Sequence, residues 1–387
     1  MEMEWCVGLM TGTVLDGNID VALLRTDGTG IDAFGSYALY PYDADTCALL
    51  AECQRQALDW QFEGPDPAVF AEAEARLTIA QSHAVRRLVE EAGLRLADIA
   101  AVGFHGQTVL HRAPTPDALG QTRQLGDGAL MVRRLGVRTV YDFRSADMEA
   151  GGQGAPLSAV YHGALMDRLG TGTDTAILNL GGVANVTARD GTGGLIAFDT
   201  GPANAPINDF VKARGLGEMD VDGRLAASGR VDEARLAKAL AHPYLTRPYP
   251  KSLDRFDFGY GWVDDMSDAD AAATLTAFTA AAVGCGLELL PERPARLIVC
   301  GGGRRNPTLL AMLAPYAGVI AEPAEAVGWE GDAIEAQCFA FLAKRCMRGL
   351  PGSFPETTGT AEPCVAGRIA KANIDTSSRP IDYSMLP

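Results

Sequence analysis

Two segments with the same pattern, residues 5–23 and 175–186, most constrain how this chain can fold. In the first, an apolar run leads into a turn of small residues that contains Gly12 and Gly17, and a second apolar run follows. The pattern predicts a strand, a tight turn and a strand, because glycine permits positive φ and the close approach of a ligand to the backbone. The second segment repeats the pattern around two adjacent glycines. The repetition predicts two related halves that each begin with a hairpin.

The turn of the first hairpin has the chemistry of a phosphate site. Its backbone N–H groups and hydroxyls such as that of Thr13 can hold phosphate oxygens, and a carboxylate such as Asp16 can hold a magnesium ion. An ordinary hairpin turn uses the same residue types, so the segment by itself leaves both interpretations open.

The length of the chain and the alternation of its elements indicate two α/β domains. A chain of 387 residues is too long for one small core, and two domains of about 150–200 residues are expected. The loop GTGTD at 170–174 is the best boundary and gives domains at 1–172 and 173–387. Beyond Pro351 we expect an irregular tail that covers the surface.

Hydrophobic periodicity places the individual elements, and strands alternate with helices as in α/β proteins. We expect strands at 5–11, 20–26, 34–40, 99–104, 137–141, 175–180, 183–186, 195–198 and 296–300, and helices at 68–93, 129–135, 157–168, 270–290, 307–314 and 333–347.

The charge and the N-terminus exclude several classes of partner. A net charge of −16 argues against nucleic acid or an anionic membrane as a partner. The chain has no run of about 18 apolar residues, so no membrane span is expected. The N-terminal MEMEW lacks the basic and apolar regions of a secretory signal, and we therefore expect a cytoplasmic protein. The eight cysteines are scattered without a C-x-x-C pair, which predicts reduced thiols.

Polar or glycine-rich residues follow six of the predicted strands, which favours an enzyme with a phosphate-bearing substrate over a binding scaffold. Asp199 ends one strand beside a glycine turn, a position that suits a general base but also suits a residue that caps the next turn. Glu335 shares a helix face with apolar residues and can point into a cleft. Alternatively, Asp332 and Glu335 form a capping box.

Three further groups have two interpretations each. His105 and His111 flank Gln107, and because a third metal ligand is missing at suitable spacing, a substrate contact or a structural hydrogen bond is favoured over a metal site. Asp142 and Arg144 suit recognition of a substrate carboxylate or hydroxyl, or form an ordinary ion pair. The glycines at 301–303 let a flat ring lie against bare backbone, or form a plain β–α turn.

Taken together, these segments resemble the anhydro-N-acetylmuramic acid kinase family over nearly the whole chain. The matching stretches, in the family's order, are GLMTGTVLDG (8–17), GFHGQTVLHR (103–112), QLGDGAL (124–130), DFRSADMEAGGQGAPL (142–157), ILNLGGVANVT (177–187), AFDTGP (197–202), VCGGGRRNP (299–307) and GDAIEAQCFAFLA (331–343).

The resemblance implies a fold and a reaction. The fold is that of the sugar kinase, actin and heat-shock ATPase superfamily, whose two related α/β domains close over ATP. The reaction opens the 1,6-anhydro ring of anhydro-N-acetylmuramic acid with water and phosphorylates O6, with ATP and Mg²⁺, to give N-acetylmuramic acid 6-phosphate and ADP. A homodimer is expected at the level of the family. Another sugar kinase of the same fold and a non-catalytic nucleotide-binding protein remain as alternatives.

The resemblance also implies roles for individual residues. Asp199 is the expected base and Glu335 a second carboxylate near the attacking water. The expected ATP-binding residues are Gly12, Thr13, Asp16, Gly17, Asp20, Gly181, Gly182, Asn185, Gly301, Gly302 and Gly303, with Asp16 also at the metal. The expected sugar-binding residues are His105, Gln107, Asp127, Asp142, Arg144 and Gln153.

The chain departs from the family's pattern at three places. Val14 stands where the family has a hydroxyl residue, so that a contact is lost or is supplied by Thr11. An additional residue between Asp16 and Asp20 is expected to displace Asp20. Ala203 replaces a glycine and disfavours positive φ at its position. These changes bear on substrate scope and rate rather than on the fold.

Overall fold

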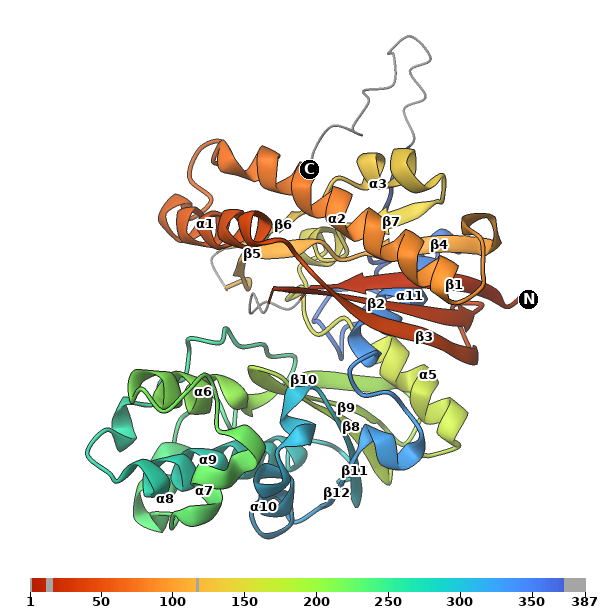
Figure 1. Ribbon diagram of the computed structural model, residues 1–387. Helices are drawn as coiled ribbons and strands as arrows, with labels where there is room; N and C mark the ends of the chain where they lie inside the picture. Colours follow the sequence, from red (N-terminus) through yellow and green to blue (C-terminus); the bar gives the residue numbers. More distant parts are fainter. Residues whose placement is uncertain (1, 12–16, 116–117, 372–387) are drawn as a thin grey trace.

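The computed structural model describes residues 2–11, 17–115 and 118–371, which form two lobes that are each built on a mixed sheet (Figure 1). The first sheet contains β1 (Glu4–Met10), β2 (Asn18–Thr26), β3 (Ile31–Pro41), β4 (Ile99–Phe104), β7 (Thr139–Tyr141) and β13 (Arg368–Ile369). The second contains β8 (Thr175–Leu180), β9 (Val183–Arg189), β10 (Leu195–Pro202), β11 (Arg296–Cys300) and β12 (Ile320–Pro323). A separate hairpin joins β5 (Gln107–Arg112) to β6 (Gln121–Leu125).

The two sheets share one topology. Five strands of the first follow the order β3-β2-β1-β4-β7, and the second follows the order β10-β9-β8-β11-β12. In each, three antiparallel strands come first; a fourth strand then pairs in parallel with the opening strand of that lobe, and a fifth pairs in parallel with the fourth. The prediction of two related α/β halves is confirmed.

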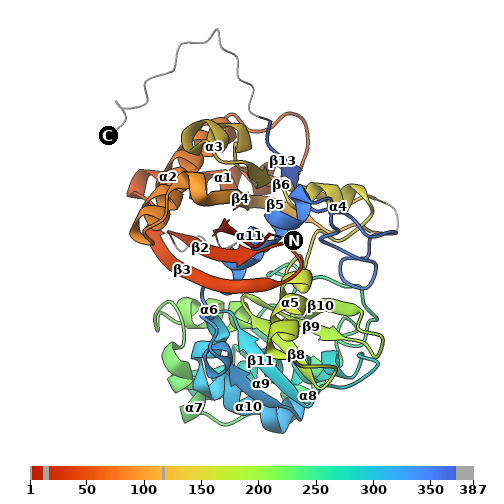
Figure 2. The same ribbon diagram turned by 90° about the vertical axis from the view of Figure 1, so that its right-hand side faces the viewer.

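Helices cover both sheets. Those of the first half are α1 (Ala44–Trp60), α2 (Val69–Glu91), α3 (Gly128–Leu135), α4 (Ser145–Glu149) and α5 (Ala159–Leu169). Those of the second are α6 (Asn204–Ala213), α7 (Arg224–Ser228), α8 (Glu233–Leu240), α9 (Asp268–Leu287), α10 (Pro307–Ala317) and α11 (Ile334–Met347). Helix α5 lies between the two sheets (Figures 1 and 2).

Helix α9 is buried on all sides because its sequence is rich in Ala and Thr and carries charges only at its start. Ser267 caps it by accepting a hydrogen bond from the N–H of Asp270. By length and mean hydropathy it could cross a membrane, but 89% of its most apolar stretch is buried inside the protein. In the described structure it is a core helix of the second lobe.

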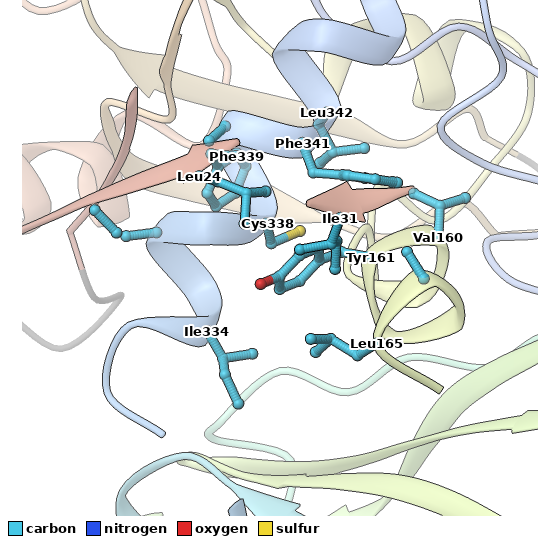
Figure 3. Packing of buried hydrophobic residues seen from close by; sticks show 14 of the residues in the cluster. Leu24, Ile31, Val160, Tyr161, Leu165, Ile334, Cys338, Phe339, Phe341 and Leu342 are labelled. Carbon is cyan, nitrogen blue, oxygen red and sulfur yellow. The ribbon is translucent and has the colours of Figure 1, made fainter. Parts of the chain in front are cut away.

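Helix α11 comes late in the chain but packs on the first sheet. A Cβ at Gly8 of β1 would lie 1.7 Å from the carbonyl oxygen of Ala336, and one at Gly103 of β4 would lie 2.0 Å from that of Phe339. The backbones therefore touch, and only glycine fits. Figure 3 shows the adjoining core, where Tyr161 of α5 points toward α11 and donates a hydrogen bond to Gln337 at 2.7 Å.

The return of α11 and β13 bears on how the domains are divided. The boundary at 172/173 remains a prediction, and the structure adds that the chain beyond residue 333 rejoins the first sheet. The tail after Pro351 was expected to cover the surface, and that expectation is wrong in part. Thr357, Thr358 and Thr360 are buried, and Thr358 donates a hydrogen bond to the buried Asp147 at 2.6 Å.

All the strands and helices expected from periodicity are present, with shifts of a few residues at their ends. One long helix was missed. Helix α1 begins after Asp43, which accepts a hydrogen bond from the N–H of Thr46 at 2.7 Å. It buries only a narrow stripe, including Leu50, Cys53 and Ala57, so its apolar periodicity is weak.

Candidate functional site

A row of polar side chains crosses the second sheet. Asn179 of β8 lies opposite Asn185 of β9, which lies opposite Asp199 of β10. Residues paired in this way project from the same face of a sheet. Their neighbours Leu178 and Phe198 belong to the core under α9, so the alternation of side chains turns the row to the other face. The row therefore lies on the face toward α11 and the first lobe.

Asp199 is the buried member of the row, with 6% of its surface exposed. The N–H of Leu253 donates a hydrogen bond to its Oδ2 at 2.8 Å, and the hydroxyl of Tyr244 donates to its carbonyl oxygen at 2.8 Å. A shift in strand register follows Asp199, and such bulges reorient side chains. Because the carboxylate is held by a distant segment, the alternative role as a cap of the next turn is wrong.

The environment of Asp199 favours its neutral form. Desolvation raises the pKa of this carboxyl to about 7, although the Leu253 hydrogen bond and the positive charges of Lys251 and Arg144 oppose the rise. A carboxyl with such a pKa can accept a proton near neutral pH.

Glu335 approaches the row from the first lobe. It lies in the first turn of α11, and its Oε1 accepts a hydrogen bond from Asn179 Nδ2 at 3.4 Å. Desolvation by nearby protein atoms raises the pKa of Glu335. The rise is limited because the side chain is exposed to solvent. The hydrogen bond from Asn179 and the charge of Arg144 oppose this rise. The structure thus brings two carboxylates, on different lobes, to one row.

The capping box that the sequence allowed at the start of α11 is wrong. The helix begins at Ile334, and the preceding Ala333 provides no side-chain cap. Asp332 instead pairs with Arg304 at 2.9 Å and with Arg305. Glu335 is therefore not engaged as a partner of Asp332 in a cap.

Arg144 and His105 form a pair in the first lobe. Arg144 donates to the carbonyl of Gly154 at 2.7 Å and to His105 Nε2 at 3.3 Å. The other ring nitrogen of His105, Nδ1, lies 2.8 Å from the carbonyl of Gly106, so a neutral ring with its proton on Nδ1 satisfies both contacts. Burial and the charge of Arg144 lower the pKa of His105 to about 3, so the ring is neutral. The charge of Arg144 also lowers the pKa of both carboxylates.

Gln153 links the two lobes. Its Oε1 accepts a hydrogen bond from the hydroxyl of Ser252, which belongs to the second lobe, at 2.6 Å. Its carbonyl lies 3.1 Å from His111 Nε2, and its N–H donates to the carbonyl of Thr358 at 2.7 Å. Gln153 is therefore held from three directions next to the segment that binds Asp199.

The other residues expected at the sugar lie in three different settings. Gln107 is fully buried. Asp142 and His105 both line a small cavity of about 110 Å³, and Asp142 pairs with Arg368 at 3.2 Å. Asp127 caps α3 by accepting a backbone hydrogen bond. Asp142 and His105 are thus brought together, whereas the contacts of Asp127 are those of a helix cap.

The turn of the second hairpin is held by Ala203 and Asn204, which follow β10. The side chain of Asn204 donates hydrogen bonds to the carbonyls of Leu180 and Gly181 at 2.9 and 2.8 Å, and the N–H of Ala203 donates to the carbonyl of Gly182 at 3.0 Å. The φ of Ala203 is −123°, so the left-handed conformation that alanine disfavours does not arise there.

The turn after β11 requires glycine at two positions. Gly301 has φ +73°, and a Cβ there would lie 2.2 Å from Asn179 Oδ1. A Cβ at Gly303 would lie 2.6 Å from Leu180 Cβ, whereas one at Gly302 would meet no atom within 4 Å. The turn therefore packs tightly on β8 and leaves bare backbone toward open space at Gly302.

Arg304 fastens this turn to α11. Its side chain is 3% exposed, pairs with Glu325 at 2.8 Å and Asp332 at 2.9 Å, and donates to the carbonyl of Gly301 at 3.1 Å. A guanidinium with three partners fixes the distance between the glycine turn and the start of the helix that carries Glu335.

We expect Arg304→Ala to lower the free energy of unfolding by roughly 2–3 kcal/mol. This is less than the ~3–5 kcal/mol typical of fully buried pairs, because both carboxylates keep access to solvent. Urea unfolding followed by circular dichroism measures the loss. Arg305→Ala is the matched control, since Arg305 pairs with the same Asp332 but is 66% exposed, and about 0–1 kcal/mol is expected. Equal losses in the two variants would contradict the role of Arg304.

The first turn lies mostly outside the described residues, which include neither Gly12, Thr13, Asp16 nor Val14. Gly17 has φ +80°, as a glycine turn requires. Asp20 lies within β2, where its Oδ1 accepts a hydrogen bond from Tyr37 at 2.7 Å.

The hydroxyl of Thr11, considered as a substitute for the one missing at position 14, donates to the carbonyl of Gly106 at 2.7 Å. Within residues 2–11, 17–115 and 118–371, no group of three His, Cys, Asp or Glu side chains is placed to hold a metal ion. The expected role of Asp16 at a metal stays a prediction.

The sequence pattern did not indicate three residues of the candidate site, namely Asn179, Ser252 and Leu253. Asn179 stands inside an apolar strand, and a polar residue near the end of such a strand was the available signal. Ser252 and Leu253 follow a proline-rich stretch with no periodicity, so no local pattern indicated them. Only their contacts with Gln153 and Asp199 reveal them.

The duplicated sheet and a row of carboxylate and amide groups beside glycine turns define a two-lobed α/β protein of the phosphotransferase class. The family model described as anhydro-N-acetylmuramic acid kinase matches residues 4–372. Curated relatives with that name include one from Jannaschia sp. (strain CCS1), numbered 2, at 73% identity over 95% of this chain and 98% of the relative. Another, from Rhizobium rhizogenes, is 64% identical over 96% and 100%. The chain belongs to the anhydro-N-acetylmuramic acid kinase family.

A solved structure with a more distant similarity also matches. Component A of (R)-2-hydroxyglutaryl-CoA dehydratase from Acidaminococcus fermentans matches with a TM-score of 0.46 and 12% identity, over 88% of this chain and 98% of that one. The family assignment rests on the sequence matches.

Proposed function

We propose that the protein opens 1,6-anhydro-N-acetylmuramic acid with water and transfers the γ-phosphoryl group of ATP to O6. Two relatives that are named for this activity match the chain at 64–73% identity over nearly their whole length. The single observation that supports it best is Asp199, a buried carboxyl whose pKa is raised to about 7 within a polar row on the second sheet that Glu335 approaches from the first lobe.

The reaction balances as follows in this proposal. A water molecule adds to C1, the C1–O6 bond breaks, and O6 forms a bond to the γ-phosphorus while ADP leaves. Ionised Asp199 accepts the proton of the water, and Arg144, whose charge acts on both Asp199 and Glu335, stabilises the developing negative charge. Glu335 hydrogen-bonds to Asn179 and orients the polar row.

The sugar and the nucleotide have separate supports. Among the expected sugar residues, His105, Arg144 and Gln153 lie on the first-lobe side of the row. For the nucleotide, the glycine turns at 181–182 and 301–303 present backbone near the row. The buried Oδ1 atoms of Asn179 and Asn185 have no hydrogen-bond partner among the described residues, which fits a ligand or hydrated cation there.

Bound Mg²⁺ would supply positive charge to the phosphate oxygens. Asp16, in the turn of the first hairpin, is the residue expected to hold the ion. We also propose a cytoplasmic location and a homodimer. Their support is the family itself.

A coupled ADP-release assay with magnesium-ATP and 1,6-anhydro-N-acetylmuramic acid tests the proposal, with mass detection of the product. A product heavier by one phosphoryl group and one water supports ring opening with transfer. ADP release without that product would indicate another acceptor. Absence of release with a folded, nucleotide-binding protein would contradict the proposal.

We expect kcat/KM for the sugar to fall as the pH drops below about 7, because the raised pKa of Asp199 leaves less of the ionised base. Well below that pKa the fall should approach about tenfold per pH unit. Initial rates from pH 5 to 9, with the coupling enzymes in excess, measure this limb. An acid limb near pH 4, the ordinary range of a carboxyl, would contradict the assignment.

A further inference from the structure

Lys251 is a buried cation that the proposed reaction does not use. It is 1% exposed. Its Nζ donates hydrogen bonds to the carbonyls of Tyr244 and Leu245 at 3.0 and 3.3 Å, and it lies 4.5 Å from the centre of the Tyr244 ring and 5.5 Å from that of Phe198. Within the described residues Lys251 forms no ion pair with a carboxylate, whereas Lys212 and Lys344 do. A buried ammonium held by neutral groups is costly and calls for a reason.

The segment that Lys251 closes holds Asp199 from three sides. The N–H of Asp199 donates to the carbonyl of Lys251 at 3.1 Å, the N–H of Leu253 donates to Asp199 Oδ2 at 2.8 Å, and the hydroxyl of Tyr244 donates to the carbonyl of Asp199 at 2.8 Å. Because its Nζ binds the backbone at 244–245 while its own carbonyl binds Asp199, Lys251 joins both ends of this segment. The intervening Ser252 contacts Gln153 of the other lobe.

We propose that Lys251 is a positioning residue for Asp199. Lys251 clamps the segment 244–253 around the carboxylate and supplies positive charge that favours the ionised form of Asp199. The inference rests on the proposed function, in which Asp199 is the base. Lys251 does not touch the substrate in this scheme, and it acts through Asp199 alone.

The charges around Asp199 and Lys251 favour a role of Asp199 as the base and of Lys251 as its positioning residue. Asp199 faces Lys251 and Arg144, both of which lower its pKa, and the neutral Tyr244 hydroxyl engages its backbone. Burial and Arg247 lower the pKa of Lys251 to about 8, whereas Asp199 and Cys285 oppose that change. Lys251 therefore carries its charge at the pH where Asp199 must be ionised, and its removal leaves Arg144 as the remaining cation that acts on the carboxyl.

The test compares Lys251→Met and Lys251→Gln with the parent enzyme. Both substitutions remove the charge, but glutamine retains an N–H donor for the clamp. We expect the acid limb of kcat/KM to move up by about 0.5–1 pH unit in both variants. At pH 9, kcat is expected to fall roughly tenfold in Lys251→Met and less in Lys251→Gln, since misplacement of a base lowers turnover. KM for ATP is expected to stay within about twofold.

Lys344→Met is the matched control, because Lys344 is another buried lysine (7% exposed) that pairs with Glu4 away from the row. It is expected to lose stability without a shift of the acid limb. An unshifted limb in folded Lys251→Gln, or the same shift in Lys344→Met, would overturn the inference.

A second measurement separates this inference from the proposed function. The ¹³Cγ resonance of Asp199, assigned by its absence in Asp199→Asn, reports the titration of the carboxyl in the full-length protein without any substrate. An upward move of its midpoint in Lys251→Gln supports the inference even if the sugar is not turned over. An unchanged midpoint overturns it even if the parent is an active kinase.

Discussion

Asp199→Asn is expected to lose turnover by roughly 10²–10⁴-fold, the range that general base catalysis contributes. The amide retains the shape of the side chain and can still accept the hydrogen bond from Leu253, but it cannot take a proton from water. Nucleotide binding should persist, because the glycine turns are untouched. Steady-state ADP release and calorimetric titration with ATP measure the two effects.

The control for this variant is Asp167→Asn. Asp167 is 66% exposed on α5 and pairs with Arg189, so the same chemical change there should leave turnover near that of the parent. Activity of Asp199→Asn within about twofold of the parent would falsify the role of Asp199 as the base.

Asp199→Asn is also expected to change how the free energy of unfolding depends on pH. The pKa of Asp199 rises from 3.8 to about 7 on folding, so the folded state binds a proton that the unfolded state releases. The parent therefore loses stability as the pH rises from about 4 to about 7, whereas an asparagine at 199 does not titrate. Relative to the parent, Asp199→Asn should gain stability across that range, and urea unfolding at pH 5 and pH 8 measures the difference.

Gly8→Ala is expected to destabilise the protein by about 3 kcal/mol or more, at or beyond the upper end of overpacking costs. The new Cβ would lie 1.7 Å from the carbonyl oxygen of Ala336 and 2.6 Å from the amide nitrogen of Ala340, which are backbone atoms of α11. The helix must move away from β1, and the loss of packing extends through the core shown in Figure 3. Chemical denaturation measures the change.

Gly172→Ala is the matched control, because a Cβ at Gly172 would meet no atom within 4 Å. Its stability should stay within about 0.5 kcal/mol of the parent. If Gly8→Ala were as stable as this control, the close contact between β1 and α11 would not be needed. Since Glu335 lies in the first turn of the same helix, residual folded Gly8→Ala should also turn over more slowly.

Much of the fold could be predicted because its signals are local. The hairpin around 181–182 follows from two apolar runs and two glycines, and α2 follows from a stripe of buried residues at helical spacing. Asp199 was predicted as a candidate base because the expected strand at 195–198 ended just before it, although β10 continues to Pro202. In contrast, α1 was not predicted because its apolar stripe is narrow.

The candidate site was only partly predictable, since its contacts join distant segments. Glu335 and Asp332 read as a capping box, but Arg304 engages Asp332 from another turn. The sequence analysis did not single out Lys251, because its burial has no local signal in an irregular stretch of the chain.

The sequence by itself determined the family, the α/β class and the pairing of two hairpins, because apolar periodicity and turn glycines act over a few residues. Only the tertiary structure decided that α11 crosses to the first sheet, that Asn179, Asn185 and Asp199 form one row, and that Lys251 lies buried behind the row. The physical reason is that burial, strand register and the pKa of a carboxyl depend on atoms brought together from distant parts of the chain.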